Sequence, residues 1–324
     1  MREVFMRSTR FLHLVSAETA AETLIEMAKR LPEEMIPLEK ACGRVLAKPI
    51  VVQKNSVLSN EMLDEVISEG ETVFAEGTIL SARDVGGLAA LCIDPVPVVR
   101  QPRVGVISTG NELVPPASKV MTGQIRDANS TLLISYLRDF GAIPVFYGIV
   151  PDVAEKLTET LRRAAEECDL VVVSGGSSKD ERDVTAGVIA QLGTVRIHGV
   201  SVAPGKPLII GTAKDTPVIG LPGNPASVYM ITQVFVTPML RKMTGEPAVE
   251  RTVRAVLSMS FPSERGREDL VRVKFRPDGT VEPCLGKSGL LNTLVHSDGY
   301  LRVPAGVDGH EAGEEVEVHL WQGC

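Results

Sequence analysis

The middle of the chain alternates between short apolar runs and longer stretches in which apolar residues recur every three or four positions. The first pattern is typical of buried strands, and the second is typical of helices that cover a sheet. The apolar runs are "RVGVIS", "IPVFYGIV", "DLVVVSG", "TVRIHGV", "PLIIGTA" and "PVIGLPG". Because these strands are apolar throughout and alternate with helices, residues 101–247 are predicted to form a doubly wound α/β domain with a mostly parallel sheet.

Other patterns flank this domain. Helical periodicity recurs in three earlier stretches, residues 16–31, 61–70 and 81–93. Residues 1–100 are therefore predicted to form a helical region, in which Ser16 caps the first helix. After Gly245 the pattern changes to short alternating strands around the turn "PDGT". Residues 248–324 are predicted to form a small antiparallel β domain, either a barrel or a sandwich.

Composition narrows the function classes. The net charge of −7 and the lack of long basic runs argue against sequence-independent binding of nucleic acid, which depends on clustered Lys and Arg. The five cysteines are scattered without a C-x-x-C motif, as expected for reduced thiols in a cytosol. The N-terminus lacks a secretory pattern, and no apolar stretch is long enough to span a bilayer. We therefore expect a cytoplasmic protein without a membrane segment.

Three loops with little side-chain bulk follow predicted strands. They are "TGNE" (109–112), "GGSSKDERD" (175–183) and "PGNP" (222–225). In open parallel sheets, ligands bind beyond the carboxyl ends of the strands, where all three loops are expected. Gly175 and Gly176 let backbone N–H groups approach a ligand closely, which suits a phosphate or another oxyanion. The alternative for this Gly pair is a tight turn from strand to helix.

Several further motifs limit the chemistry. "GQIRDANS" (123–130) precedes a helix that either Asp127 or Asn129 could cap. "VAPGKPL" (202–208) carries Lys206 but is not a P-loop, because Pro207 stands where Ser or Thr should follow the lysine. The sequence also lacks G-x-G-x-x-G after a strand, H-E-x-x-H and G-x-S-x-G. These absences argue against a Walker-type ATPase, a dinucleotide enzyme, a zinc protease and a serine hydrolase.

Acidic residues also fall on the predicted loops. They are Glu112, Asp127, Asp180 and Asp183. Carboxylates beside a phosphate site often bind Mg²⁺, which prefers oxygen ligands. For any single one of them, simple solvation at the surface is the alternative.

Taken together, the motifs resemble one family, the molybdopterin molybdenumtransferases, which include MoeA and the E domain of gephyrin. The resemblance is dense over about residues 95–324 and weaker before them. It rests on "GVISTGNEL", "GQIRDANSTLL", "SGGSSKDERD", "VAPGKP", "GLPGNPAS" and "SGLLNTLVHSDGYLRVPAG", all in family order. No single motif is specific, but the set is.

The resemblance implies a MogA-like α/β domain that binds the pterin phosphate, followed by a β-barrel domain, in a homodimer. Adenylylated molybdopterin would be the substrate, molybdate or tungstate would enter at the dithiolene, and AMP would be released with the help of Mg²⁺. Glu112, Asp127 and Asp183 match the acidic site positions of the family, with Asp127 and Asp183 as metal ligands. The implied binding residues are Thr109, Gly110, Ser174, Gly175, Gly176, Ser177, Ser178, Pro204, Gly205, Lys206, Pro222, Gly223, Asn224 and Pro225.

The chain departs from the family pattern in two places. Asp180 stands where the family has Gly, which adds a negative charge near an anionic substrate. Residues 53–74 occupy the position of a whole inserted β-rich domain, and Asn60 replaces an acid of its first motif. The missing carboxylates leave open a non-catalytic molybdopterin carrier or regulatory homologue. A nucleotide pyrophosphatase with the MogA fold is a further alternative.

Overall fold

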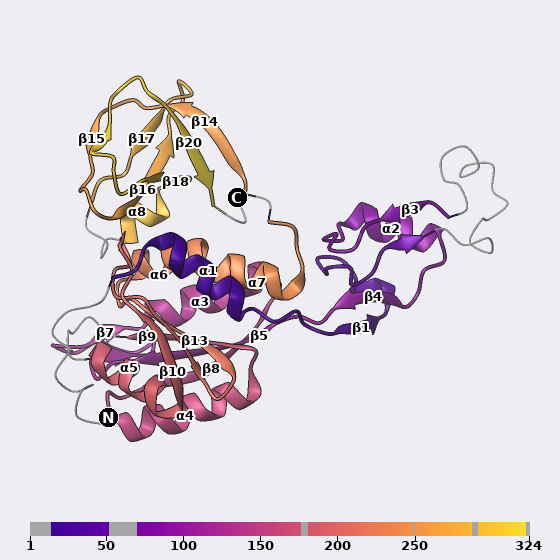
Figure 1. The fold of residues 1–324 in the computed structure, drawn as a ribbon, viewed down its shortest axis with the longest axis horizontal. Coiled ribbons are helices and arrows are strands. Elements are labelled where there is room, and N and C mark those ends of the chain that lie inside the picture. Colours follow the sequence, from indigo (N-terminus) through magenta and orange to yellow (C-terminus); the bar gives the residue numbers. More distant parts are fainter. Residues whose placement is uncertain (1–13, 52–69, 176–180, 249, 287–290, 322–324) are drawn as a thin grey trace. The chain divides into compact units, whose positions relative to one another are not determined.

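The computed structural model divides the chain into two compact units, each of which is described by itself (Figure 1). The first unit comprises residues up to 27, residues 103–237 and residues from 250 onward. The second comprises residues 28–102 and 238–249. The residues that the structure describes are 14–51, 70–175, 181–248, 250–286 and 291–321.

A six-stranded sheet in the order β10-β12-β13-β9-β5-β8 forms the centre of the first unit. Its strands are β5 (Arg103–Thr109), β8 (Ile143–Val150), β9 (Leu170–Gly175), β10 (Gly193–His198), β12 (Ile209–Ala213) and β13 (Thr216–Leu221). Strands β13, β9, β5 and β8 are mutually parallel, which confirms the predicted doubly wound architecture. Strand β12 runs antiparallel, because a two-residue turn at Lys214 and Asp215 joins it to β13 as a hairpin.

Helices cover both faces of this sheet (Figure 1). On one face, α4 (Ala154–Glu167) and α5 (Glu181–Leu192) pack through Leu157, Leu161 and Ile189 onto Val171 and Val173. The helices on the other face are α1 (Ala17–Met27), α3 (Ala128–Asp139) and α6 (Pro225–Ile231). Helix α6 continues through the π-helical turn η3 (Thr232–Val236) into α7 (Thr237–Thr244), as the long helical pattern predicts.

The C-terminal part of the first unit is a small β barrel. Its strands are β14 (Thr252–Val256), β16 (Glu268–Phe275), β17 (Val281–Pro283), β18 (Gly299–Val303) and β20 (Glu315–Leu320). A bridge between Leu257 and Val281 joins the β14 end of the sheet to β17, which closes the barrel. Strand β15 (Phe261–Pro262) pairs with β19 (Gly309–His310), and the short helix α8 (Leu291–Val295) precedes β18.

Two features join the barrel to the α/β layers. Strand β11 (Val202–Ala203), which the chain reaches directly after β10, pairs with β16 of the barrel. The buried ring of Trp321 stacks on Tyr300 at 5.2 Å and meets the edge of Tyr229 on α6 at 5.1 Å. Its indole N–H donates to the Ser297 carbonyl oxygen at 2.9 Å. The barrel and the α/β layers are therefore packed against each other.

The second unit is mixed, which corrects the prediction of a helical region over residues 1–100. Strand β1 (Glu33–Ile36) pairs with β4 (Val96–Val99), and β2 (Ile50–Val51) pairs with β3 (Thr72–Phe74). These strands and the 3₁₀ turn η2 (Leu38–Lys40) accompany the predicted helix α2 (Ala82–Ala90). Proline at positions 32, 37, 95 and 97 limits helix in the segments beside β1 and β4. The helix predicted over 61–70 lies outside the described residues except for Gly70, which is in a turn.

Within the described ranges, none of the helices combines the length and hydrophobicity that crossing a bilayer requires.

Candidate functional site

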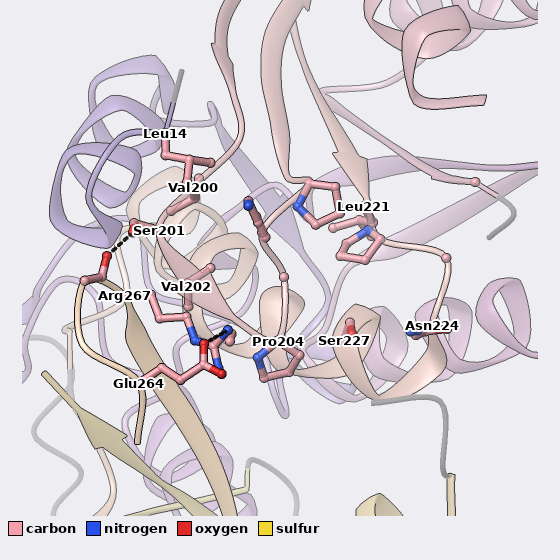
Figure 2. Close-up of a pocket in the computed structure, with 18 of the residues that line it drawn as sticks. Leu14, Val200, Ser201, Val202, Pro204, Leu221, Asn224, Ser227, Glu264 and Arg267 are labelled. Atoms are coloured by element: carbon pink, nitrogen blue, oxygen red, sulfur yellow. Dashed lines mark hydrogen bonds and ion pairs between the residues drawn. The ribbon is translucent and has the colours of Figure 1, made fainter. Parts of the chain in front are cut away.

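A pocket of about 480 Å³ opens at the carboxyl ends of β9 and β13 (Figure 2). Glu264 and Arg267 from the barrel lie on one side of it, and Asn224 and Ser227 at the start of α6 lie on the other. It contains seven of the residues predicted for ligand binding: Gly175, Pro204, Gly205, Lys206, Pro222, Gly223 and Asn224. Loops separated by up to about fifty residues in the sequence therefore converge on one cavity, as expected for a parallel sheet.

The loop that carries Lys206 is held close to α6. Gly205 has φ +125°, and a Cβ atom there would lie 2.1 Å from Cδ1 of Ile231, so that only glycine fits. The Val200 N–H donates to the Lys206 carbonyl oxygen at 2.9 Å, which fixes the loop to the wall of the pocket. The Lys206 side chain is exposed, and the described residues provide no carboxylate in ion-pair contact with it. This cation is available to an anionic ligand.

One buried amide connects the loops behind the pocket. The Asn129 Nδ2 group donates to Ser174 Oγ at the end of β9 and to the carbonyl oxygen of Gly223 after β13, each at 2.8 Å. Asn129 is 9% exposed and lies in the first turn of α3. The sequence left Asp127 and Asn129 as alternative caps; Asp127 is the cap, since its Oδ1 accepts from the Ser130 N–H at 3.0 Å. Asn129 has the separate task of joining β9 to β13.

Oxygen atoms without hydrogen-bond partners gather near this amide. Among the described residues, Asp127 Oδ2, Asn129 Oδ1 and Ser108 Oγ are buried and unpartnered. Ser108 lies opposite Ser174 in the register of β5 and β9, which places it beside the same amide. Because buried polar atoms are nearly always satisfied, an oxygen-rich site with missing partners is a candidate for a cation or a hydrogen-bond donor. These oxygen atoms suit Mg²⁺ as ligands, because the ion often binds one or two carboxylates together with substrate phosphates.

Glu112 lies in a turn beside β5 rather than on the wall of the pocket. The Thr109 hydroxyl donates to Asp152 Oδ1 at 2.8 Å, and the Asn111 N–H donates to Asp152 Oδ2 at 3.0 Å. Gly110 has φ +155°. The Glu112 carboxylate lies close to it, because a Cβ atom added at Gly110 would be 2.9 Å from Glu112 Oε2. The turn continues into β6 (Leu113–Val114), which pairs with β7 (Ile125–Arg126) directly before Asp127. Glu112 and Asp127 thus flank one two-stranded ladder.

The remaining predicted residues are placed as follows. Ser174 is buried in β9, and Pro225 is the first residue of α6. Asp183 belongs to the first turn of α5, but its side chain is outside the description. Gly176, Ser177, Ser178 and Asp180 lie outside the described residues. In the described ranges, no three acidic, histidine or cysteine side chains are grouped for a metal.

Sequence reasoning missed the contribution of the barrel. The turn before β16 provides Glu264, Arg265, Gly266 and Arg267 to the pocket. Its two arginines are paired with acids: Arg265 with Asp308, and Arg267 with Glu264 and Asp269. The segment "SERGRED" offered a signal, since a dense run of alternating charges is unusual between two strands. Its position at the pocket depends on tertiary packing that no local pattern reveals.

A second cavity of about 330 Å³ adjoins the first and shares Ala203, Pro204 and Arg267 with it. Arg272 lines this cavity, is only 5% exposed, and has an Nε group without a partner among the described residues. Burial lowers the pKa of the Arg272 guanidinium and raises the pKa of the neighbouring Cys284 thiol. A buried arginine without a carboxylate is a strong candidate for binding an oxyanion.

Comparisons with known proteins agree with these features. Residues 105–242 match the family model described as "Probable molybdopterin binding domain", and residues 254–321 match "MoeA C-terminal region (domain IV)". A molybdopterin biosynthesis protein of Methanocaldococcus jannaschii is 35% identical over 269 residues, which are 80% of this chain and 65% of that protein. Molybdopterin molybdenumtransferase 2 of Mycobacterium tuberculosis is 32% identical over 88% of this chain and 72% of its own length.

Solved structures give the same result. The molybdopterin biosynthesis MoeA protein from Pyrococcus horikoshii superimposes with a TM-score of 0.84 at 27% identity, covering 96% of this chain and 100% of that one. A molybdenum cofactor biosynthesis protein from Pyrococcus furiosus gives a TM-score of 0.77 at 32% identity, covering 95% of this chain and 100% of that one. The chain spans about two thirds of the length of the M. jannaschii relative.

Proposed function

The chain belongs to the MoeA family of molybdopterin molybdenumtransferases, and from this membership we propose that it binds adenylylated molybdopterin and inserts molybdate or tungstate with release of AMP. The observation that carries the proposal is the pocket at the carboxyl ends of β9 and β13, which seven predicted binding residues line. Its exposed Lys206 and the backbone of the Pro222–Asn224 loop suit a phosphate-bearing ligand.

The adjoining cavity supports a place for the second substrate. Arg272 supplies a buried guanidinium that lacks a carboxylate partner among the described residues, as a site for a tetrahedral oxyanion requires. Molybdate and tungstate have the same charge and similar size, so both suit this site. In the reaction, the dithiol of molybdopterin displaces one oxygen of the oxyanion, which leaves as water with the two thiol protons. Hydrolysis of the phosphoanhydride adds the elements of water across the bond and releases AMP.

The chain also offers oxygen ligands for Mg²⁺. Asp127 Oδ2 is buried and unpartnered among the described residues, and Asp183 is the second predicted ligand at the start of α5. When bound, the ion neutralises phosphate charge and so favours cleavage of the anhydride. The task of the protein itself is to hold Asp127 at the cap of α3, where its Oδ1 is already engaged by Ser130.

A non-catalytic molybdopterin carrier is the second candidate. It is favoured by residues 53–74, which stand where the family has its inserted domain and the acids of that domain. A homodimer, as in the family, is part of the proposal for either role.

Incubation with adenylylated molybdopterin and molybdate tests the proposal. Two results together would support the transferase: release of AMP, detected by chromatography, and formation of the molybdenum cofactor. Tight binding without AMP release would establish the carrier instead, and no binding would overturn both.

The variant Lys206→Met tests the role of the pocket's exposed cation, because it removes the charge and retains the apolar stem of the side chain. We expect it to weaken binding about tenfold.

A further inference from the structure

A single buried carboxylate holds the barrel turn that contributes to the pocket. Asp269, on β16, is 9% exposed. Its Oδ2 accepts from the Ser263 hydroxyl at 2.7 Å and from the Glu264 N–H at 3.4 Å. Its Oδ1 accepts from the Arg267 Nε group at 2.8 Å. Both oxygens are therefore committed to the turn, and the bond to the guanidinium is charge-assisted.

Arg267 is the charged side chain common to the two cavities. Its Nη1 lies 2.9 Å from Glu264 Oε2, but the Glu264 side chain is 76% exposed, so that this contact is weak and screened by solvent. The Nη2 group has no hydrogen-bond partner among the described residues. Since a guanidinium is a rigid plane, fixing Nε at Asp269 determines where Nη2 points.

Ser201, the residue before β11, also bonds to this turn. The Ser201 hydroxyl donates to the Gly266 carbonyl oxygen at 2.6 Å, and the Glu268 N–H donates to the Ser201 carbonyl oxygen at 2.9 Å. The backbone of the turn is therefore restrained without Asp269. Asp269 adds its bonds to Ser263 and Glu264 and, through Oδ1, the orientation of the Arg267 side chain.

We propose that Asp269 is a positioning residue for ligand binding: it aims the Arg267 guanidinium at the junction of the two cavities, where the phosphate of molybdopterin would meet the oxyanion. The inference rests on the proposed function for the identity of the ligand. A merely structural Asp269 would stabilise the barrel but would not depend on Arg267 for its effect on binding. The two roles therefore differ in how substitutions at the two positions combine.

The test is a double-mutant cycle on the full chain, with Asp269→Asn, Arg267→Ala and the double variant. Isothermal titration calorimetry would measure the Kd for molybdopterin that has been released anaerobically from a molybdoenzyme. We expect each single variant to bind about tenfold more weakly and the double variant to lose no more than about twofold beyond Arg267→Ala. A loss of about a hundredfold in the double variant, or wild-type affinity in Asp269→Asn, would overturn the inference.

Two further variants make the result decisive. Glu315→Gln breaks an exposed ion pair with Arg254 in the same barrel and should leave the Kd unchanged. If Asp269→Asn does not fold, Ser263→Ala replaces it, since it removes one bond to the same carboxylate. We expect an affinity loss of about threefold, and unchanged affinity would count against the positioning role. Failure of the wild-type chain to bind molybdopterin would instead reject the proposed function, and with it the ligand of this inference.

Discussion

At the scale of single residues, the site depends on side chains that bond to two elements at once. Asn129 is the clearest example, because one amide nitrogen donates both to Ser174 Oγ and to the Gly223 carbonyl oxygen. Each acceptor ends a different strand of the sheet. Without the amide, the buried Ser174 hydroxyl and the part-buried Gly223 carbonyl oxygen would lose their partner, and a buried polar atom without a partner costs about 1–3 kcal/mol.

Asn129→Ala should therefore lower the free energy of unfolding by about 2 kcal/mol. Urea denaturation followed by circular dichroism measures the change. The exposed Asn292 on α8 provides the control, and Asn292→Ala should stay within about 0.5 kcal/mol of wild type. Equal stability of Asn129→Ala and wild type would show that the amide does not join the two strand ends.

Gly205→Ala tests the close approach of the lysine loop to α6. The added Cβ would lie 2.1 Å from Ile231 Cδ1, at a φ of +125°. We therefore expect the free energy of unfolding, measured by urea denaturation, to fall by about 2–3 kcal/mol, and ligand binding to weaken. Gly279→Ala has φ +83° but open space around it, and separates backbone strain from the clash. Truncation of the neighbour in Gly205→Ala/Ile231→Ala should recover part of the affinity. No recovery would argue that the clash is unimportant.

Glu246 gives a prediction for pH. Burial raises the pKa of its carboxyl group, and the Thr244 hydroxyl and Arg241 oppose this in part. The folded state therefore binds the proton more tightly than the unfolded state, so stability falls as the pH rises from the unfolded pKa to the folded one. Glu246→Gln should be more stable than wild type at pH 7 and no more stable at pH 3. Urea midpoints at both values check this, with the exposed Glu39→Gln as control.

At the scale of elements, the sequence predicted strands and helices well where packing is local. The apolar runs became β5, β8, β9, β12 and β13, and the helical pattern after residue 224 became α6, η3 and α7. The sequence did not predict how the strands pair, because an apolar run does not specify which strand lies beside it or in which direction. Thus the antiparallel direction of β12 and the membership of β11 in the barrel came only from the structure.

The same distinction applies to the site. The loops after β9 and β13 were predicted, because glycine and small polar residues at strand ends have a direct physical meaning. The barrel turn with Arg267, the bridge by Asn129 and the buried Arg272 were not, because each depends on contacts between distant segments. The sequence therefore predicted the pocket residues that follow the sheet strands, but not those that the barrel contributes.

Strand β11 offers a prediction at this scale. Ser201→Ala removes the hydroxyl bond to the Gly266 carbonyl oxygen, which should cost about 1 kcal/mol. The loss should loosen the pairing of β11 with β16. Hydrogen exchange should therefore speed up at the Glu268 amide, which donates to the Ser201 carbonyl oxygen, and remain unchanged at Val318 in β20. Unaltered exchange at Glu268 would mean that the hydroxyl does not hold the two strands together.

At the scale of the whole molecule, the two units do not follow the chain in order. The second unit takes residues 238–249 from beyond the α/β region, through contacts such as the Leu31 N–H with the Met243 carbonyl oxygen at 2.9 Å. The apolar helical pattern continues to Gly245, and Pro238 is the one signal in it that coincides with the boundary between the units. The division into 1–100, 101–247 and 248–324 stays a prediction from sequence.

The proposed homodimer gives a prediction at this scale. In analytical ultracentrifugation the protein should sediment at twice the mass of the 34.8 kDa chain.

The packing of Trp321 between Tyr229 and Tyr300 gives the molecule an internal optical probe. It is the single tryptophan of the sequence, so all indole emission comes from the seam between barrel and α/β layers. A fluorophore buried there should emit at short wavelength and shift to the red when the seam opens, whether or not helices and strands persist. Light from one residue would thus report, without any label, how tightly the two sides of the ligand pocket are held together.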